Sequence, residues 1–242
     1  MTAAQPTIIA TSIGLRREPG RPDGAAGPAY TLAAELARAG RHPRLCIIPT
    51  AMGDNAVYLP ALYAAFSRLD MLVSHLALFP MPSEPNIREH LLAQDIIWVA
   101  GGSTANLLAV WRLHGLDVIL RECWEAGVVL MGVSAGSVCW HIGGTTDSFG
   151  LPLQPITNAL AFLPYSNCPH YDSEPGRRPL YQRLIAEGVV PDGYATDDGT
   201  GLVFFGQELH EAITELDGTS AYSVRRGADG QAVETALPTR LL

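Results

Sequence analysis

Apolar and polar positions along the chain form two alternating kinds of segment. Near-continuous runs of Val, Ile and Leu, typical of strands buried on both faces of a parallel sheet, lie at 7–13, 44–50, 71–79, 95–101 and 128–133. Segments of helical period separate them, such as 28–40, which begins with Pro28 and ends with Gly40 as helices commonly do. The pattern predicts repeated strand-helix-strand units and therefore an α/β fold with a mainly parallel sheet.

The pattern changes after about residue 195. Short alternating segments at 200–206, 209–216 and 220–227 predict antiparallel strands that close the same sheet. The Pro- and Gly-rich stretch 17–28 predicts a surface loop near the carboxyl end of the first strand, where α/β proteins place ligand-binding loops. No linker-like stretch divides the chain, so we expect a single domain over residues 1–242.

Composition excludes several classes of protein. The formal net charge of −8 repels nucleic acid, and basic residues cluster only in short runs. No apolar run reaches the roughly 18 residues that a membrane-spanning helix needs, and the N-terminal residues lack the features of a secretory signal. Four cysteines without C-x-x-C spacing indicate neither a zinc site nor a disulfide framework. We expect a cytoplasmic protein that uses no metal and no cofactor and binds neither nucleic acid nor membrane.

The motif Gly-Val-Ser-Ala-Gly at 132–136 follows a predicted buried strand and precedes a predicted helix. In this context G-x-S-x-G places a serine on a tight turn, and its two glycines avoid collisions with the strained backbone. The turn aims the Ala135 N–H at the space beside the Ser134 hydroxyl, where it could stabilise an oxyanion. Ser134 is therefore a candidate nucleophile. The pattern also fits a packing turn, or a helix N-terminus that binds phosphate.

A nucleophilic serine requires a general base, and His170 is the candidate because its polar, loop-like surroundings are unsuited to a core histidine. Asp147 or Asp198 could orient its imidazole ring, although each could instead be an ordinary turn residue. A second Gly-rich strand-to-helix junction supplies backbone N–H groups at Gly101 and Gly102. As a phosphate cradle this junction lacks the P-loop lysine and the full G-x-G-x-x-G, so it fits better as a second oxyanion donor.

Four stretches together resemble peptidase E, the aspartyl dipeptidase family related to cyanophycinase. They lie in the family's order at 96–117, 126–150, 168–184 and 193–204, and the resemblance runs from about residue 45 to the last residue. It implies a class I glutamine amidotransferase-like three-layer sandwich with a nucleophile elbow. It also implies a serine peptidase that hydrolyses dipeptides or short peptides after an N-terminal aspartate through an acyl-enzyme.

The same resemblance implies roles for individual residues. Ser134 matches the nucleophile and His170 the general base, while the amides of Gly102 and Ala135 match the oxyanion hole. For the third member of the triad, the resemblance implies two candidates. Peptidase E proper has an acid at the position of Asp147. Cyanophycinase-like relatives have theirs in the segment that contains Asp198. We favour Asp147 and keep Asp198 open.

Charge gives an expectation about the substrate. An acidic protein that binds an aspartyl side chain needs a local cation, and Arg177 and Arg178 follow His170 by seven and eight residues. Arginine presents a planar fork that matches a carboxylate, so these two are candidate substrate-binding residues. The alternative is that they form the solvated start of a helix.

Other functions also fit the sequence. A cyanophycinase-like peptidase that acts on β-aspartyl-arginine would need an acidic subsite for the arginine, and would use Asp198 as the orienting acid. A protein that binds a small molecule on the same fold without catalysis would keep the turn and lose the triad. A conventional α/β-hydrolase is disfavoured because no suitable histidine follows His210. The oligomeric state is open, a homodimer included.

Overall fold

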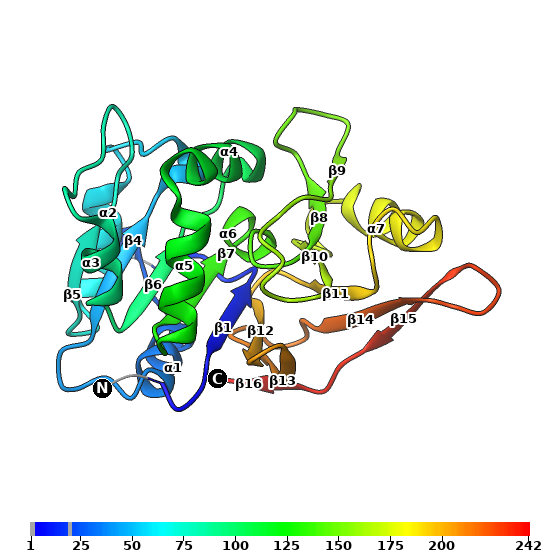
Figure 1. Ribbon diagram of the computed structural model, residues 1–242. Helices are drawn as coiled ribbons and strands as arrows, with labels where there is room; N and C mark the ends of the chain where they lie inside the picture. Colours follow the sequence, from blue (N-terminus) through cyan, green and yellow to red (C-terminus); the bar gives the residue numbers. More distant parts are fainter. Residues whose placement is uncertain (1–2, 19–20) are drawn as a thin grey trace.

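An eight-stranded mixed sheet forms the centre of the fold in the computed structural model, which describes residues 3–18 and 21–242 (Figure 1). Its five parallel strands are β1 (Thr7–Thr11), β4 (Arg44–Ile48), β5 (Leu72–His75), β6 (Ile96–Val99) and β7 (Val129–Val133). They lie in the order β1-β7-β6-β4-β5. Each matches one of the predicted apolar runs, so the α/β prediction is confirmed.

Beyond β1 the sheet continues with β12 (Thr200–Phe205) and β13 (Glu208–Thr214), each antiparallel to its neighbour, and with β16 (Thr239–Leu241), parallel to β13. The prediction of antiparallel strands at 200–206 and 209–216 is therefore confirmed. The Pro- and Gly-rich stretch differs from prediction, because β2 (Arg16–Glu18) and β3 (Arg21–Ala25) pair as a small two-stranded sheet. A two-stranded sheet consists of edge strands, and edge strands can contain proline, so the composition of this stretch is compatible with a strand pair. Residues 19–20 of the predicted loop lie outside the described residues.

Helices cover both faces of the large sheet, because alternate strand residues point to opposite sides. Ile8 and Ala10 of β1 belong to one apolar cluster, and Ile9 belongs to another. The cluster around Ile9 packs against α1 (Pro28–Leu36) and α2 (Leu59–Ser67). The opposite cluster packs against α3 (Ile87–Leu92), α4 (Thr104–His114) and α5 (Leu116–Glu125). A 3₁₀ helix, η1 (Thr50–Met52), follows β4.

A second sheet lies beside the first and ends in the long hairpin at the right of Figure 1. Its strands are β8 (Gly143–Thr146), β9 (Gln154–Ile156), β10 (Ser166–Pro169), β11 (Gly193–Thr196), β14 (Ala221–Arg226) and β15 (Ala232–Ala236). Their order is β15-β14-β11-β10-β8-β9, and α7 (Arg177–Ala186) packs on this sheet. The prediction that 220–227 closes the first sheet is wrong, because β14 pairs with β11. Alternation of apolar and polar residues predicts a strand but not the strand with which it pairs. Val224 of β14 is buried in the apolar cluster that includes Leu180, Tyr181 and Leu184 of α7.

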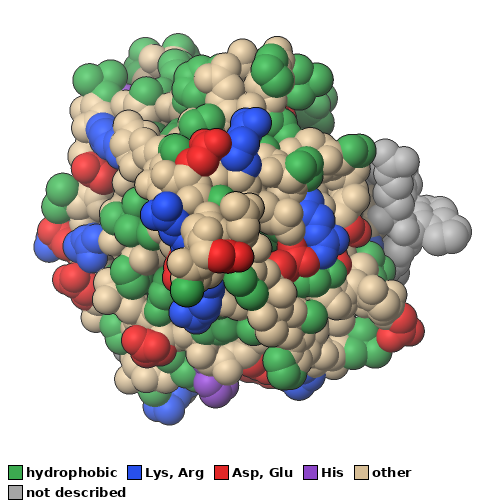
Figure 2. Space-filling model, turned by 90° about the vertical axis from the view of Figure 1, so that its right-hand side faces the viewer, with side chains coloured by type: hydrophobic (Ala, Val, Ile, Leu, Met, Phe, Trp, Pro, Cys, Tyr) green, Lys and Arg blue, Asp and Glu red, His purple; other side chains and the backbone are tan. Residues whose placement is uncertain are grey.

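The surface on the side of α7 and β15 mixes acidic and basic side chains, with no large area of one charge on the face that Figure 2 shows. Ion pairs such as Arg178 with Glu234 contribute to this mixture. None of the helices in residues 3–18 and 21–242 combines the length and the apolar character needed to cross a membrane.

Candidate active site

Ser134 lies in a strained turn between β7 and the four-residue helix α6 (Ala135–Val138). Its backbone φ is +56° with ψ of −114°, a combination outside the regions that non-glycine residues ordinarily occupy and one that costs free energy. The turn is held by a hydrogen bond from Ser134 N to Thr11 O at 3.0 Å and by bonds from Ser137 N and Val138 N to Ser134 O. The predicted strand-to-helix junction is present, but the helix is a single turn and contributes less dipole than a long helix would.

Both glycines of the motif are required by close backbone approach. A Cβ on Gly132 would lie 2.0 Å from the carbonyl oxygen of Gly136, and a Cβ on Gly136 would lie 2.3 Å from the carbonyl oxygen of Val99. These atoms belong to backbone and cannot rotate away. The motif therefore has glycine at both positions because β6, β7 and α6 touch through their main chains.

The glycine-rich junction after β6 lies against the Ser134 side chain. A Cβ on Gly101 would be 3.1 Å from Ser134 Cβ and 3.8 Å from Ser134 Oγ. Gly102 has a φ of +132°, and a Cβ there would be 2.3 Å from Ala51 O. Within the described residues, neither Gly102 N–H nor Ala135 N–H donates a hydrogen bond to a protein group. One unpaired backbone donor therefore follows Ser134 directly, and the other follows Gly101, which lies against the serine side chain.

His170 follows β10 directly and also has a left-handed backbone, with φ of +56°. Its N–H donates to Ser12 Oγ at 3.0 Å, and the neighbouring residue Thr11 accepts the Ser134 N–H. The histidine and the serine are thus fixed to consecutive residues at the carboxyl end of β1. Sequence reasoning missed Ser12, although its place just after the first strand was a usable signal.

The acid beside His170 is Asp198. His170 Nδ1 lies 2.5 Å from Asp198 Oδ1. Because an ionised carboxylate only accepts hydrogen bonds, Nδ1 is the donor in this contact, and Nε2 is the ring nitrogen that does not contact the acid. The contact follows from topology, because β10 and β11 are parallel neighbours with Pro169 opposite Thr196. His170 and Asp198 therefore leave the same edge of the second sheet.

The preference for Asp147 is corrected by the structure. Asp147 also follows a strand parallel to β10, but it begins the turn toward β9, where its carbonyl accepts the Gly150 N–H at 2.8 Å. Its side chain is exposed, and among the described residues its carboxylate forms no hydrogen bond or ion pair with His170. The structure thus brings Asp198 to the imidazole and leaves Asp147 in solvent.

The two predicted substrate-binding arginines already have partners. Arg177 is 3% exposed, donates from Nε to Glu174 Oε2 at 2.8 Å, and donates from Nη1 to Thr145 O at 3.1 Å. Arg178 forms an ion pair with Glu234 on β15. The expectation that these guanidinium groups are available to a substrate is therefore corrected, because Arg177 is buried and bound to Glu174, and Arg178 is bound to Glu234.

Arg178 is also covered on the faces of its guanidinium. The group lies 4.9 Å from the ring centre of Tyr171 and 5.0 Å from that of Tyr222. Burial of the Tyr171 ring, and then the hydrogen bond that its hydroxyl donates to Glu234, raise the pKa of Tyr171 far above its ordinary value. The cluster joins α7 to β14 and β15 and is a structural feature of the second sheet.

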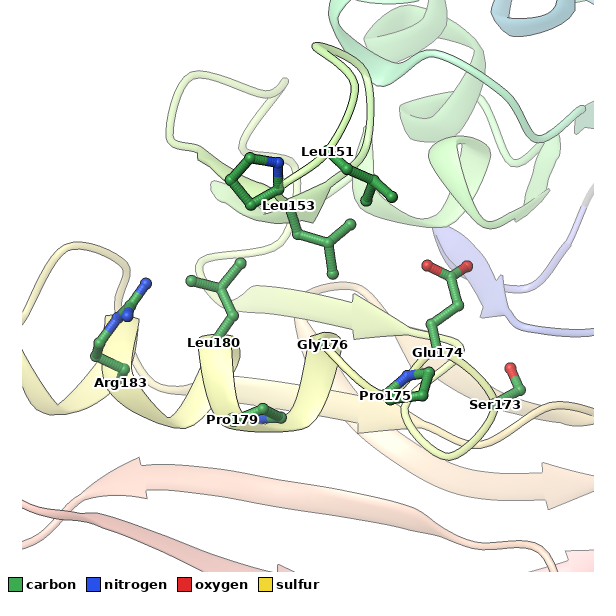
Figure 3. Close-up of a pocket in the computed structure, with 10 residues that line it drawn as sticks. Leu151, Leu153, Ser173, Glu174, Pro175, Gly176, Pro179, Leu180 and Arg183 are labelled. Atoms are coloured by element: carbon green, nitrogen blue, oxygen red, sulfur yellow. The ribbon is translucent and has the colours of Figure 1, made fainter.

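Two cavities border the chain at and after His170: one has His170 in its lining, and the other has Ser173 and Glu174 in its lining. The smaller, of about 280 Å³, is lined by Ser12, Arg16, His170, Asp198 and Glu215 among others. The larger, of about 650 Å³, is mostly apolar. In Figure 3, Leu151, Leu153 and Leu180 converge on the larger cavity from the segment before β9 and from α7, with Glu174 and Arg183 at opposite ends. In the described part of the chain, no group of three His, Cys, Asp or Glu side chains is placed to hold a metal ion.

Comparison with known proteins identifies the family. The profile of peptidase family S51 matches residues 29–212. The chain belongs to peptidase family S51. The predicted resemblance to peptidase E is confirmed, since relatives of this S51 chain carry that name.

Three relatives show the range of similarity. The uncharacterized peptidase YgaJ of Bacillus subtilis is 44% identical over 202 residues, which cover 83% of this chain and 85% of that protein. Peptidase E of Shewanella denitrificans is 37% identical over 126 residues, 48% of this chain and 52% of that one. A probable alpha-aspartyl dipeptidase of Drosophila melanogaster is 27% identical over 147 residues, 60% of this chain and 59% of that protein. The family and these relatives support a peptidase.

Solved structures support the α/β fold. The crystal structure of a peptidase from an acI-B1 Actinobacterium aligns with a TM-score of 0.70 at 15% identity, covering 97% of this S51 chain and 95% of that one. A Listeria monocytogenes protein provisionally assigned as peptidase E aligns with a TM-score of 0.61 at 24% identity, covering 86% and 98%. At these identities the likeness concerns the fold alone.

Proposed function

We propose that the protein is a serine exopeptidase that hydrolyses dipeptides or short peptides after an N-terminal aspartate. The observation that carries the proposal is the strained Ser134 turn, flanked by the unpaired N–H groups of Gly102 and Ala135. A serine held in this way on a sharp strand-to-helix turn is a nucleophile elbow. The arrangement, together with a mainly parallel sheet covered by helices on both faces, supports a class I glutamine amidotransferase-like sandwich as the fold.

The mechanism follows from the partners of each group. His170 Nε2 takes the proton of the Ser134 hydroxyl as Oγ attacks the α-carbonyl carbon of the N-terminal aspartate. The oxyanion accepts hydrogen bonds from Gly102 N–H and Ala135 N–H, which need no reorganisation because no protein group occupies them. Asp198 holds the imidazole in the required tautomer and stabilises the imidazolium.

Collapse of the tetrahedral intermediate completes acyl transfer. The imidazolium of His170 gives its proton to the leaving amine as the peptide C–N bond breaks, which leaves an aspartyl ester on Ser134. A water molecule then attacks the ester carbonyl while His170 accepts its proton. The tetrahedral intermediate releases free aspartate and returns the proton to Ser134 Oγ.

A cyanophycinase-like activity on β-aspartyl-arginine is the second candidate, and the contact between His170 and Asp198 is the feature that favours it. That activity also needs an acidic group for the arginine. Glu174 lines the larger cavity, but its carboxylate is already bound to Arg177. Among the described residues that line the larger cavity, Glu174 is the only carboxylate and is not free, so we prefer the aspartyl dipeptidase.

Hydrolysis of chromogenic N-terminal amides tests the proposal. The substrates are the aspartyl amide and its Glu, Asn, Ala and Leu analogues, with β-aspartyl-arginine assayed in parallel. We expect turnover of the aspartyl amide alone, and a loss of at least about 10³-fold in Ser134→Ala. Ser67→Ala, at the exposed end of α2, is the matched control and should retain wild-type activity.

Each other outcome contradicts a defined part of the proposal. Retention of activity in Ser134→Ala would remove Ser134 from the chemistry. Cleavage of β-aspartyl-arginine in preference to the aspartyl amide would select the second candidate. Equal turnover of the Asp, Ala and Leu amides would leave a serine peptidase without aspartyl specificity.

A further inference from the structure

The smaller cavity beside His170 contains an arginine whose role the mechanism leaves unassigned. Arg16, at the start of β2, lines this cavity of about 280 Å³ together with His170 and Asp198. Its side chain is 41% exposed, and its contact with Glu215 is an ion pair of 3.6 Å between Nε and Oε2. Among the residues that the structure describes, no acceptor forms a hydrogen bond with its guanidinium group. Arg16 is therefore available to an anion.

Glu215 is built into the fold as a fixed partner for Arg16. Its side chain is 1% exposed, and its Oε1 accepts the Ala29 N–H at 2.8 Å in the first turn of α1. A Cβ on Gly27 would lie 2.0 Å from Oε2, so the helix can approach the carboxylate only because glycine precedes it. Burial raises the pKa of Glu215, while the Ala29 hydrogen bond and Arg16 oppose the rise.

The ion pair with Glu215 involves only one edge of the Arg16 guanidinium group. The Nε edge faces Glu215, and the Nη atoms remain for a second carboxylate, since arginine donors lie in one planar fork. Glu215 reduces the freedom that Arg16 would lose on binding, which favours association. Arg16 also borders a neighbouring cavity of about 390 Å³ along α1, so the alternative is that it only separates the two cavities.

The charges around the cavity restrict the ligand. Asp198 and Glu215 both line it, so a simple anion meets two carboxylates as well as Arg16. An N-terminal aspartyl residue avoids this penalty because its α-ammonium group balances its side-chain carboxylate. The cavity thus fits a residue that carries one charge of each sign.

We propose that Arg16 binds the side-chain carboxylate of the substrate's N-terminal aspartate, and that Glu215 is the positioning residue that holds Arg16. The inference rests on the proposed function for its substrate class. It differs from the sequence-based expectation of Arg177 and Arg178, whose guanidinium groups are bound elsewhere.

Substitution of the pair tests the proposal through the preference for Asp over Asn amides. Arg16→Gln should lower this ratio by about 10- to 100-fold, mainly through KM, because one charge-assisted carboxylate interaction is lost. Arg16→Lys should restore part of the ratio. Glu215→Gln keeps an acceptor for Ala29 N–H and should raise KM for the Asp amide with little change in kcat. Arg88→Gln, which removes an exposed arginine paired with Glu122, is the matched control and should behave as wild type.

Direct binding separates this inference from the proposed function. In the Ser134→Ala background, Asp-Ala should bind at least 10-fold more tightly than Asn-Ala, and Arg16→Gln should abolish the difference. An unchanged ratio in Arg16→Gln would overturn the role of Arg16, even if the wild type cleaves Asp amides. Absence of Asp-amide hydrolysis together with Arg16-dependent binding of Asp-Ala would overturn the proposed activity alone. Equal loss for Asp and Asn ligands would make Arg16 a structural residue and would also overturn the inference.

Discussion

Replacement of Asp198 by Asn removes the charge that orients His170 while leaving the shape of the side chain. Asp198 Oδ1 accepts the Nδ1 proton at 2.5 Å, and an amide there either presents its own N–H groups or accepts without a charge. In a serine peptidase with a buried aspartate, the same change lowers kcat by about 10⁴-fold. The Asp198 side chain is 44% exposed, so water replaces part of the lost stabilisation. We therefore expect a loss of about 10²- to 10³-fold, or about 3 to 4 kcal/mol in the barrier.

The matched control is Asp147→Asn, which changes the acid that the sequence favoured. Asp147 is exposed and outside the His170 contact, so its substitution should alter activity by no more than about twofold. Both variants are assayed for aspartyl-amide hydrolysis and for the rate of acylation by a fluorophosphonate, with thermal unfolding to confirm the fold. A large loss in Asp147→Asn beside a small loss in Asp198→Asn would refute the assignment drawn from the structure.

Three further predictions concern the fold around the site. Gly132→Ala should abolish soluble expression or lower the free energy of unfolding by at least about 3 kcal/mol, because its Cβ would lie 2.0 Å from Gly136 O. Gly40→Ala is the control: a Cβ there meets open space, so urea unfolding should be unchanged. His141 is fully buried, which lowers its pKa from 6.5 to about 4, so the unfolding free energy should fall by about 3 kcal/mol as the pH drops from about 6.5 to 4. His141→Gln should remove most of this slope, and an unchanged slope in urea titrations at several pH values would count against it. Arg177→Gln should destabilise the protein by about 2 kcal/mol in thermal unfolding while the Asp:Asn preference stays intact, and a selective loss of that preference would restore its predicted substrate role.

The sequence predicted the parts of the site that depend on local chain geometry. The turn at Ser134 needs only a strand, a short helix and glycines two residues away, and all of these are encoded within residues 128–138. The five parallel strands were predicted for the same reason, because their apolar runs are local. The sheet that each later strand joins depends on distant partners, so the alternation of 220–227 predicts a strand but not its pairing with β11.

The acid beside His170 and the proposed substrate-binding cation could not be chosen from the sequence. Asp147 and Asp198 both follow strands that end at the same edge of the second sheet, and only the turn after each strand determines where the carboxylate points. Asp197, next to Asp198, instead accepts hydrogen bonds from Ser220 N–H and the Tyr222 hydroxyl. Proximity in sequence to His170 made Arg177 a candidate, but burial against Glu174 became visible only in the structure.

The measurement that tests the central claim most directly is covalent labelling by a fluorophosphonate, followed by intact mass and peptide mapping. We expect one adduct per chain on Ser134, none in Ser134→Ala, and much slower labelling in His170→Ala, because the hydroxyl depends on that imidazole for activation. An adduct on another serine, or equal labelling with and without His170, would contradict the claim that Ser134 and His170 form the reactive centre of this peptidase.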